Sequence, residues 1–314
     1  MGGRSPKWHS VWRGGRAVAG GADGLIEYVQ ALEELGVDSF WAIDHPMTFG
    51  ADCWTMLAAL ATTTTQRIRL GSLVSCVYYR HPALLARMAA DVDRLSHGRL
   101  VLGLGMGDSA VEFDRMGIPL RPVRERQQGV EETIRIVHGL WGRERFSLAG
   151  EQFEIREATV VPGPVQEPHV PVVIAGGGVR VTLRQVAEFA DACNFGKNPN
   201  TGGVSTLGDV HRRFEALQRH CATVGRPYES VLRTHSTLLL VLAETEAGLQ
   251  PKLEAIPPAL LAPTSLIGTP AKAVAYYRAL IDAGMQYFIA FVYGNDLETP
   301  RLLMEQVAPE FHTP

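Results

Sequence analysis

The chain alternates short apolar segments with amphipathic ones over most of its 314 residues. The short segments are rich in β-branched and apolar residues, as expected for buried strands, and the others have the spacing of helices. Helices separate nearly all of the strands, and this alternation predicts a parallel sheet. Seven strands are predicted, at residues 37–43, 67–75, 99–107, 172–178, 192–195, 233–243 and 286–292.

The helices between them also follow from the apolar spacing and from helix-end signals. A hairpin with Ala149 and Gly150 at its turn is predicted within residues 145–155, and residues 244–268 are expected to be irregular. The predicted helices cover residues 23–36, 52–64, 81–96, 124–141, 181–190, 207–225, 270–284 and 299–311.

The strand count favours an α/β fold of the (β/α)8 TIM-barrel type. A weak additional strand near the N-terminus would bring the count to the eight that such a barrel requires. The alternative is a doubly wound open sheet. No G-x-G-x-x-G motif opens a helix after the first predicted strand, which counts against a dinucleotide-binding sheet. A looser match, Gly105–Ala110, follows a middle strand and is a weak signal.

The first 22 residues differ from the rest in being rich in glycine and arginine. They lack the apolar core of a secretory signal and show no convincing strand, so we expect a largely irregular segment at 1–22. The alternative is a short strand around His9–Trp12. The remainder, 23–314, is predicted to form a single TIM-barrel domain with insertion segments and a degenerate or missing first strand.

Composition narrows the possible partners. The net charge is −3, which gives no general attraction to nucleic acid or to an anionic membrane. No apolar run approaches the roughly 18 residues of a membrane span. The four cysteines lie far apart without metal-type spacing, so neither a metal site nor a disulfide framework is expected. These features predict a cytoplasmic protein with neither nucleic acid nor a membrane as its partner.

Candidate site residues are those at the C-terminal ends of the predicted strands, where TIM barrels place their chemistry. Asp44 and His45 follow one strand, and the next ends at Ser75 and Cys76. His45 could be an acid–base group, although an isolated Asp-His pair is more often an ordinary capped loop. The other strand ends carry Gly105, Met106, Gly107 and Asp108, then Gly176, Gly177 and Gly178, then Asn194, Phe195 and Gly196.

The stretch AGGGVRVTL at 175–183 has a clear physical interpretation. Three glycines allow the backbone to approach a ligand closely, and the helix that follows points unpaired N–H groups toward the same place. Such an arrangement suits a phosphate. The alternative is a tight turn between strand and helix that binds nothing.

Four longer stretches resemble the bacterial luciferase-like flavin and deazaflavin oxidoreductases, which are TIM barrels. With the helix ERQQGVEETIRIVHGLW, they extend the resemblance over most of residues 23–311. Within that family the chain is most similar to the branch that uses coenzyme F420, a deazaflavin. The four stretches are GVDSFWAIDHP at 36–46, residues 67–107 ending in GLGMG, PVVIAGGGVRVTLRQVAEFADACNF at 171–195 and GTPAKAVAYYRALIDAGMQYFIAFV at 268–292.

The resemblance implies roles for individual residues. His45 would lie against the deazaflavin ring as proton donor or acceptor, with Asp44 hydrogen-bonding at the same place. A non-proline cis peptide, Leu73–Val74, would stand behind the ring, with Cys76 nearby. Gly105, Met106, Gly107 and Asp108 would pass the ring edge, Gly176, Gly177, Gly178 and Val179 would hold the phosphate, and Asn194 would lie at the ribityl side.

The resemblance implies an oxidoreductase that exchanges hydride between coenzyme F420 and a small organic substrate, as an F420H2-dependent reductase. The alternatives are an FMN-dependent monooxygenase and a non-catalytic flavin-binding homologue. Asp108 and Glu112 are only candidates for the general acid of sugar-oxidising members, so sugar chemistry is not inferred. A homodimer is expected, through the helices between Asp52 and Leu95. Loops 48–52, 197–206 and 244–268 are expected to shape the substrate pocket.

Overall fold

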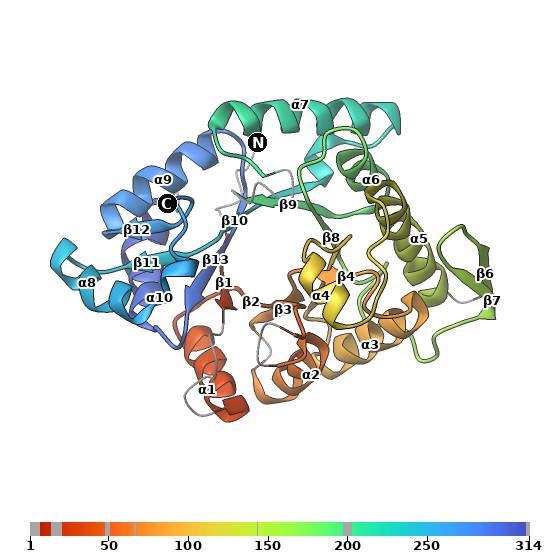
Figure 1. Cartoon of the computed structure of the whole chain (residues 1–314), viewed down its shortest axis with the longest axis horizontal. Helices are drawn as coiled ribbons and strands as arrows, with labels where there is room; N and C mark the ends of the chain where they lie inside the picture. Colours follow the sequence, from red (N-terminus) through yellow and green to blue (C-terminus); the bar gives the residue numbers. More distant parts are fainter. Residues whose placement is uncertain are drawn as a thin grey trace.

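A computed structural model describes residues 7–13, 21–47, 51–65, 67–142, 144–196 and 203–311. Its main sheet is parallel and curls round the middle of the molecule (Figure 1). The strands of this sheet are β1 (Lys7–Arg13), β2 (Ser39–Ala42), β3 (Arg69–Ser72), β4 (Ser75–Cys76), β5 (Leu100–Gly105), β8 (Val172–Ala175), β9 (Ala192–Gly196), β10 (Leu232–Thr237) and β13 (Tyr287–Tyr293).

The strand order identifies the sheet as a barrel and not as an open sheet. Strands follow one another as β3-β2-β1-β13-β10-β9-β8-β5, and β3 also pairs with β5, so that the sheet returns on itself. This is the TIM-barrel arrangement that the alternation of strands and helices predicts. All pairings within this sheet are parallel, which places every strand's C-terminal end on the same side.

Helices cover the outside of the sheet (Figure 1). Two of those near the site begin at capped residues: the Asp52 side chain accepts from the Thr55 N–H at the start of α2, and His81 accepts from the Ala83 N–H at the start of α3. The helices are α1 (Gly21–Glu34), α2 (Cys53–Thr63), α3 (Pro82–Leu95), α4 (Ala110–Arg115), α5 (Val123–Trp141), α6 (Thr182–Phe189), α7 (Leu207–Thr223), α8 (Glu246–Ala255), α9 (Pro270–Asp282) and α10 (Glu298–Leu302), which continues as a π turn (Leu303–Val307) and a 3-10 turn (Ala308–Phe311).

The N-terminal segment is where the structure differs from the sequence-based expectation. Residues 7–13, expected to be irregular with a short strand around His9–Trp12 as the alternative, form β1, which pairs in parallel with β13 and with β2. Neither partner strand is adjacent to β1 in the sequence, and β13 lies near the other end of the chain. Because pairing of this kind leaves no local signal, the glycine- and arginine-rich surroundings concealed the strand. Residues 1–6 and 14–20 lie outside the described part of the chain.

Two smaller sheets lie outside the barrel. The predicted hairpin forms, with β6 (Phe146–Ala149) antiparallel to β7 (Glu154–Ala158). The expected strand at 233–243 is divided into β10 and a separate strand, β11 (Leu240–Leu242), which pairs with β12 (Leu266–Gly268). Residues 244–268, expected to be irregular, therefore contain both α8 and β12, and they pack around a small core of their own that includes Leu239, Val241 and Leu249.

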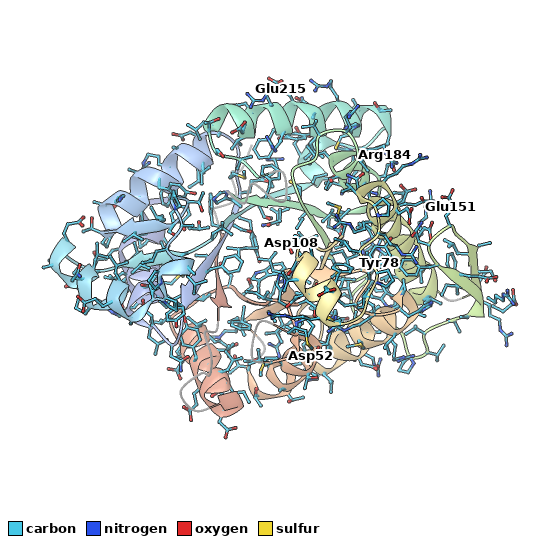
Figure 2. The ribbon with its side chains drawn as sticks, in the orientation of Figure 1. Asp52, Tyr78, Asp108, Glu151, Arg184 and Glu215 are labelled. Carbon is cyan, nitrogen blue, oxygen red and sulfur yellow. The ribbon has the colours of Figure 1, made fainter. Side chains whose placement is uncertain are left out.

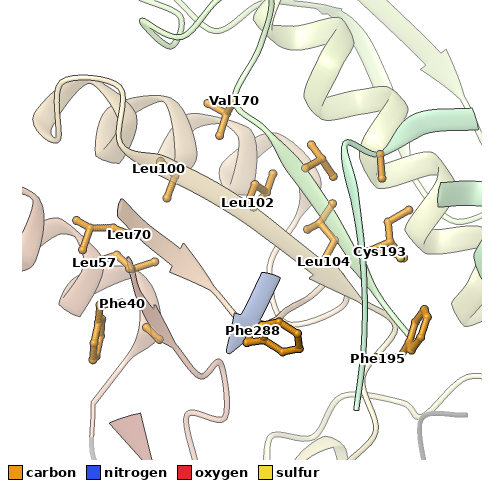
Figure 3. Close-up of a cluster of buried hydrophobic side chains, with 14 of the residues drawn as sticks. Phe40, Leu57, Leu70, Leu100, Leu102, Leu104, Val170, Cys193, Phe195 and Phe288 are labelled. Atoms are coloured by element: carbon orange, nitrogen blue, oxygen red, sulfur yellow. The ribbon is translucent and has the colours of Figure 1, made fainter. Parts of the chain in front are cut away.

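In the barrel strands whose side chains the structure describes, apolar residues face two different cores. Trp41, Val101, Val173 and Ile289 point to the inside of the barrel, where they pack together. The residues between them face the surrounding helices, and Figure 3 shows part of this larger outer core. The outer core residues labelled there are Phe40, Leu57, Leu70, Leu100, Leu102, Leu104, Val170, Cys193, Phe195 and Phe288. Filled cores on both faces hold the strand ends in fixed positions.

The strand formed by β3 and β4 contains a bulge next to the site. Between the pairs Gly71↔Val101 and Ser75↔Leu104, this strand takes one residue more than β5. The Leu73–Val74 peptide bond inside the bulge is cis, as the resemblance implied. The Ser72 hydroxyl donates to the Gly103 carbonyl at 2.9 Å, which fastens the bulge to β5. The bulge turns Leu73 and Val74 toward the barrel mouth.

Candidate functional site

A cavity of about 330 Å³ opens at the C-terminal ends of the barrel strands. Its volume lies in the range of small-molecule and cofactor sites. In Figure 2, Asp108 lies beside α4 near the middle of the molecule, whereas Arg184 and Glu215 project from the outer helices. The predicted site residues that line the cavity are Asp44, His45, Leu73, Val74, Cys76, Gly105, Met106, Gly107, Asp108, Gly176, Gly178, Asn194, Phe195 and Gly196.

Three predicted residues, Ser75, Gly177 and Val179, do not line the cavity. Ser75 and Gly177 are buried, and Val179 is 43% exposed. The Val179 carbonyl accepts a hydrogen bond of 2.8 Å from His220 Nε2 on α7. The chain turns at Gly176, where φ is 120°, and by Val179 it has reached α7. The glycine-rich turn therefore faces the cavity through Gly176 and Gly178 only.

Asp44 is a buried carboxylate held by an arginine from a neighbouring strand end. Its side chain is 2% exposed, and Arg80 Nη1 donates to Asp44 Oδ2 at 2.6 Å. The same guanidinium donates to Asp52 Oδ2 at 2.7 Å. Burial raises the pKa of Asp44, and the bond and charge of Arg80 oppose that rise. Arg80, which lies just before the start of α3, therefore fixes the residue next to His45.

His45 lies between two carboxylates. Its Nδ1 is 2.9 Å from Glu112 Oε2, and its Nε2 is 3.8 Å from Asp108 Oδ1. The Tyr79 hydroxyl donates to the same Glu112 oxygen at 3.1 Å. The imidazole is 28% exposed, so it can meet a ligand in the cavity, whereas the Glu112 side chain is fully buried. The arrangement can hold and exchange a proton at the cavity wall.

Two positions in the wall formed by the β5 end have no room for a side chain. A Cβ at Gly105 would lie 2.6 Å from Val74 Cγ2, and one at Gly107 would lie 2.8 Å from Cys76 Sγ. Gly107 also has a φ of 78°, which favours glycine. Arg126 Nη1 on α5 donates to the Gly107 carbonyl at 2.6 Å and fixes this turn. Backbone atoms thus form a flat surface on this side.

Cys76 is an unreactive part of the wall. Burial raises the pKa of its thiol to about 12, with smaller contributions from the neighbouring charges of Asp44 and Asp108. A thiol protonated in this way is neither a nucleophile nor a metal ligand at neutral pH. All four cysteines of the chain are buried and unpaired. Among the described residues, no cluster of three or more histidine, cysteine, aspartate or glutamate side chains suits a metal ion.

The opposite side of the cavity is polar and structured. Asn194 on β9 donates to the Thr234 hydroxyl at 2.8 Å and accepts from the Ser236 hydroxyl at 2.6 Å. The first turn of α6, which follows Gly178, has no side-chain cap, and Thr182 in that turn lines the cavity. Uncapped N–H groups at a helix start favour an anion. The glycine turn at Gly176 and Gly178, the flat surface at the end of β5 and the uncapped start of α6 together fit a flat cofactor that carries a phosphate.

Several lining residues were not identified from the sequence, namely Tyr79, Gln127, Thr182, Gln185 and Ser236. The two glutamines lie on α5 and α6, where Gln185 Nε2 donates to the Gln127 carbonyl at 2.8 Å. Polar residues of an amphipathic helix are normally expected on its solvent-exposed face. The sequence therefore did not distinguish these two glutamines from solvated side chains. Glu112, considered only as a possible acid, is joined to His45 across a separation of 67 residues.

Fold and cavity together define a TIM-barrel protein with a cofactor-sized site at its strand ends. The chain belongs to the luciferase-like monooxygenase family, whose model matches residues 8–287. This confirms the family to which the sequence motifs pointed. Within the described residues, no helix combines the length and apolar character needed to cross a membrane.

Individual relatives agree with this assignment. The chain is 27% identical over 302 residues to an F420-dependent glucose-6-phosphate dehydrogenase of Amycolatopsis mediterranei, covering 87% of this chain and 90% of the relative. Among solved structures, the coenzyme F420-dependent tetrahydromethanopterin reductase of Methanopyrus kandleri superposes with a TM-score of 0.81 at 17% identity, covering 98% of this chain and all of the other. An F420-dependent secondary alcohol dehydrogenase gives 0.79 at 15% identity, with the same two coverages. The structural likenesses show the shared fold.

Proposed function

We propose that the protein is an oxidoreductase that exchanges hydride between coenzyme F420 and a small organic substrate, acting as an F420H2-dependent reductase. The observation that carries the proposal is His45, presented at the wall of a cofactor-sized cavity with Glu112 behind it. The named activity of the Amycolatopsis relative supports the cofactor. Coenzyme F420 would supply the hydride chemistry, and the protein would supply orientation and a proton.

In this proposal each wall of the cavity has one task. Gly105 and Gly107 let the flat ring lie against backbone, with Leu73 and Val74 behind it. Gly176 and Gly178, with the uncapped start of α6, bind the phosphate. Asn194 contacts the ribityl chain. His45 donates or accepts the proton that accompanies hydride transfer, and Asp44, held by Arg80, supports the turn that presents it.

The second candidate is an FMN-dependent monooxygenase, favoured by the name of the family whose model matches the chain. The two proposals separate on oxygen. A deazaflavin reacts poorly with oxygen because carbon replaces one ring nitrogen, whereas reduced FMN reacts readily. The third candidate is a homologue that binds flavin without turnover.

The deciding experiment is a pair of fluorescence titrations of the purified protein, one with coenzyme F420 and one with FMN. Tight binding of F420 alone supports the proposal, and preference for FMN supports the monooxygenase. Binding of neither rejects both activities. His45→Ala should then abolish turnover and leave F420 affinity within about threefold, because a proton-transfer group contributes mainly to the rate. His211→Ala, at an exposed position on α7, is the matched control.

We further propose a cytoplasmic homodimer. Four buried, unpaired cysteines fit a reducing compartment. On α3, Leu84 is 53% exposed and Leu95 is 45% exposed, so this helix presents apolar side chains at the surface where the sequence places the interface. Light scattering coupled to size exclusion should give twice the mass of the chain, and Leu84→Glu should halve it.

A further inference from the structure

Glu112 is the buried partner of His45, and its position in the fold is closely determined. It lies in the first turn of α4, where the Ser109 side chain accepts from the Glu112 N–H. Its side chain is fully buried although it carries a carboxyl group. Burying a carboxylate is costly unless hydrogen bonds compensate it. Its Oε2 atom accepts from Tyr79 and lies 2.9 Å from His45 Nδ1.

Tyr79 donates one of the two hydrogen bonds at Glu112 Oε2. Burial raises the pKa of the Tyr79 hydroxyl far above its ordinary value, and nearby Cys76 and Glu112 raise it further. Tyr79 therefore keeps its proton and donates to Glu112. In its ionised form Glu112 only accepts hydrogen bonds, and the bond to His45 Nδ1 then requires a proton on Nδ1.

The other ring nitrogen is on the cavity side. His45 Nε2 is 3.8 Å from Asp108 Oδ1, which is longer than a hydrogen bond, and Asp108 itself lines the cavity and is 36% exposed. With Nδ1 protonated in the neutral ring, Nε2 carries the lone pair. Proton exchange with the substrate can therefore take place at Nε2: an imidazolium donates the proton in the reductase direction, and the neutral ring accepts it in the reverse direction. In both cases the imidazolium lies against Glu112.

We propose that Glu112 is a positioning residue, which fixes His45 in the Nδ1–H tautomer and so assigns proton exchange with the substrate to Nε2. The proposal rests on the function proposed above, because it assumes that His45 exchanges that proton. Its structural part concerns the protein without cofactor and can be tested there. Tyr79 assists by holding the shared oxygen of Glu112 from the other side.

The first test is the tautomer of His45 in the cofactor-free protein. Long-range 15N–1H spectra of histidine-labelled protein at pH 8 distinguish the two tautomers, and a His45→Gln variant identifies the signals of His45. We expect the Nδ1–H form in the natural sequence. In Glu112→Gln the amide can donate to Nδ1, so the population should shift toward the Nε2–H form. Asp114→Asn, an exposed carboxylate on the same helix, should leave the spectrum unchanged.

Kinetics of the loaded enzyme provide the second test. Glu112→Gln should lower kcat by about 100-fold or more with little change in KM or in F420 affinity, as expected when the wrong tautomer is populated in an intact site. Glu112→Asp, which keeps the carboxylate, should recover part of the loss. Tyr79→Phe should have a smaller effect than Glu112→Gln, because the bond between Glu112 and His45 remains.

Two results would overturn the proposal. One is an Nε2–H tautomer of His45 in the natural sequence, which needs no variant to fold. The other is a Glu112→Gln protein that keeps both the Nδ1–H signal and its kcat. Failure of the proposed function would look different: the spectra would follow the expected pattern, but neither coenzyme F420 binding nor hydride transfer would be detected.

Discussion

At the scale of single residues, the site depends on charges that are buried and paired. Arg80 holds Asp44, whose carboxyl is almost completely buried. Arg80→Met should cost about 3 kcal/mol of unfolding free energy at pH 7, because it leaves Asp44 buried and unpaired. Without Arg80 the already raised pKa of Asp44 rises further above its unfolded value. The contribution of Asp44 to stability is then greatest at low pH and falls as pH increases, so the deficit of the variant relative to the natural sequence should be smaller at pH 5 than at pH 7.

Urea denaturation of both proteins at the two pH values measures this effect. Asp52→Asn is the control, because asparagine also caps helices and the bond between Arg80 and Asp44 remains. Its cost should stay within about 1 kcal/mol, since Asp52 is partly exposed. An Arg80→Met deficit that does not change with pH would show that lost packing, and not the charge on Asp44, causes it.

A second residue-scale prediction concerns two glycines that flank α4. Gly107 and Gly117 both have positive φ, at 78° and 66°. A Cβ at Gly107 would lie within 3 Å of Cys76 and Phe113, whereas one at Gly117 would meet nothing within 4 Å. Gly117→Ala should therefore cost about 1 kcal/mol from backbone strain alone. Gly107→Ala should cost about 1–3 kcal/mol more, and thermal unfolding of both variants compares them. Equal losses would mean that the cavity wall adjusts.

At the scale of elements, a carboxylate on α5 holds the β6–β7 hairpin. Glu132 accepts three backbone N–H groups at the hairpin tip, from Glu151, Gln152 and Phe153, each at 2.9 Å. Glutamine has a single acceptor oxygen, so Glu132→Gln should leave at least one N–H unpaired, at about 1–3 kcal/mol. Hydrogen exchange at 150–153 should accelerate. Glu154→Gln, at an exposed position on the hairpin, is the control. Equal protection from hydrogen exchange at residues 150–153 in both variants would contradict the anchoring role of Glu132.

Element type was the part of the structure that the sequence could predict. Helices and strands with clear periodicity form where expected, because burial of one face both creates the pattern and stabilises the element. β1 was missed because its partners, β2 and β13, lie far away in the chain. Residues 246–255 form α8 despite Pro251 inside it. There, Leu249 and its neighbours pack onto a small tertiary core that local sequence does not reveal.

At the scale of the whole molecule, topology accounts for the part of the site that was predicted. Parallel strands bring their C-terminal ends together, so listing strand-end residues found His45, Asp108 and Asn194 before any contact was known. Partner residues do not follow from topology. Arg80 reaches Asp44 across 36 residues, and Glu112 reaches His45 from a helix between strands. Such contacts depend on side-chain direction and loop path, which strand order leaves open.

The response of the whole molecule to acid should depend on the end of α5. The ring of His138 packs at a tilt against that of His169 with centroids 4.5 Å apart, and among the residues that the structure describes its buried Nε2 has no hydrogen-bond partner. Burial, followed by the neighbouring His169, lowers the pKa of His138 to about 4, while Asp191 opposes this. The unfolded chain takes up this proton near pH 6.5 and the folded chain only near pH 4, so stability falls as pH decreases between these values.

The expected loss over this range is up to about 3 kcal/mol from His138 alone. Urea denaturation at pH 7, 5.5 and 4.5 should show it, and His138→Phe should flatten the decline because it keeps an aromatic ring and removes the titrating group. His211→Asn, at an exposed position on α7, should leave the slope unchanged. If His138→Phe declines as steeply as the natural sequence, the acid response must come from other groups, such as carboxylates paired in the folded state, of which Asp52 beside Arg80 is the first to test.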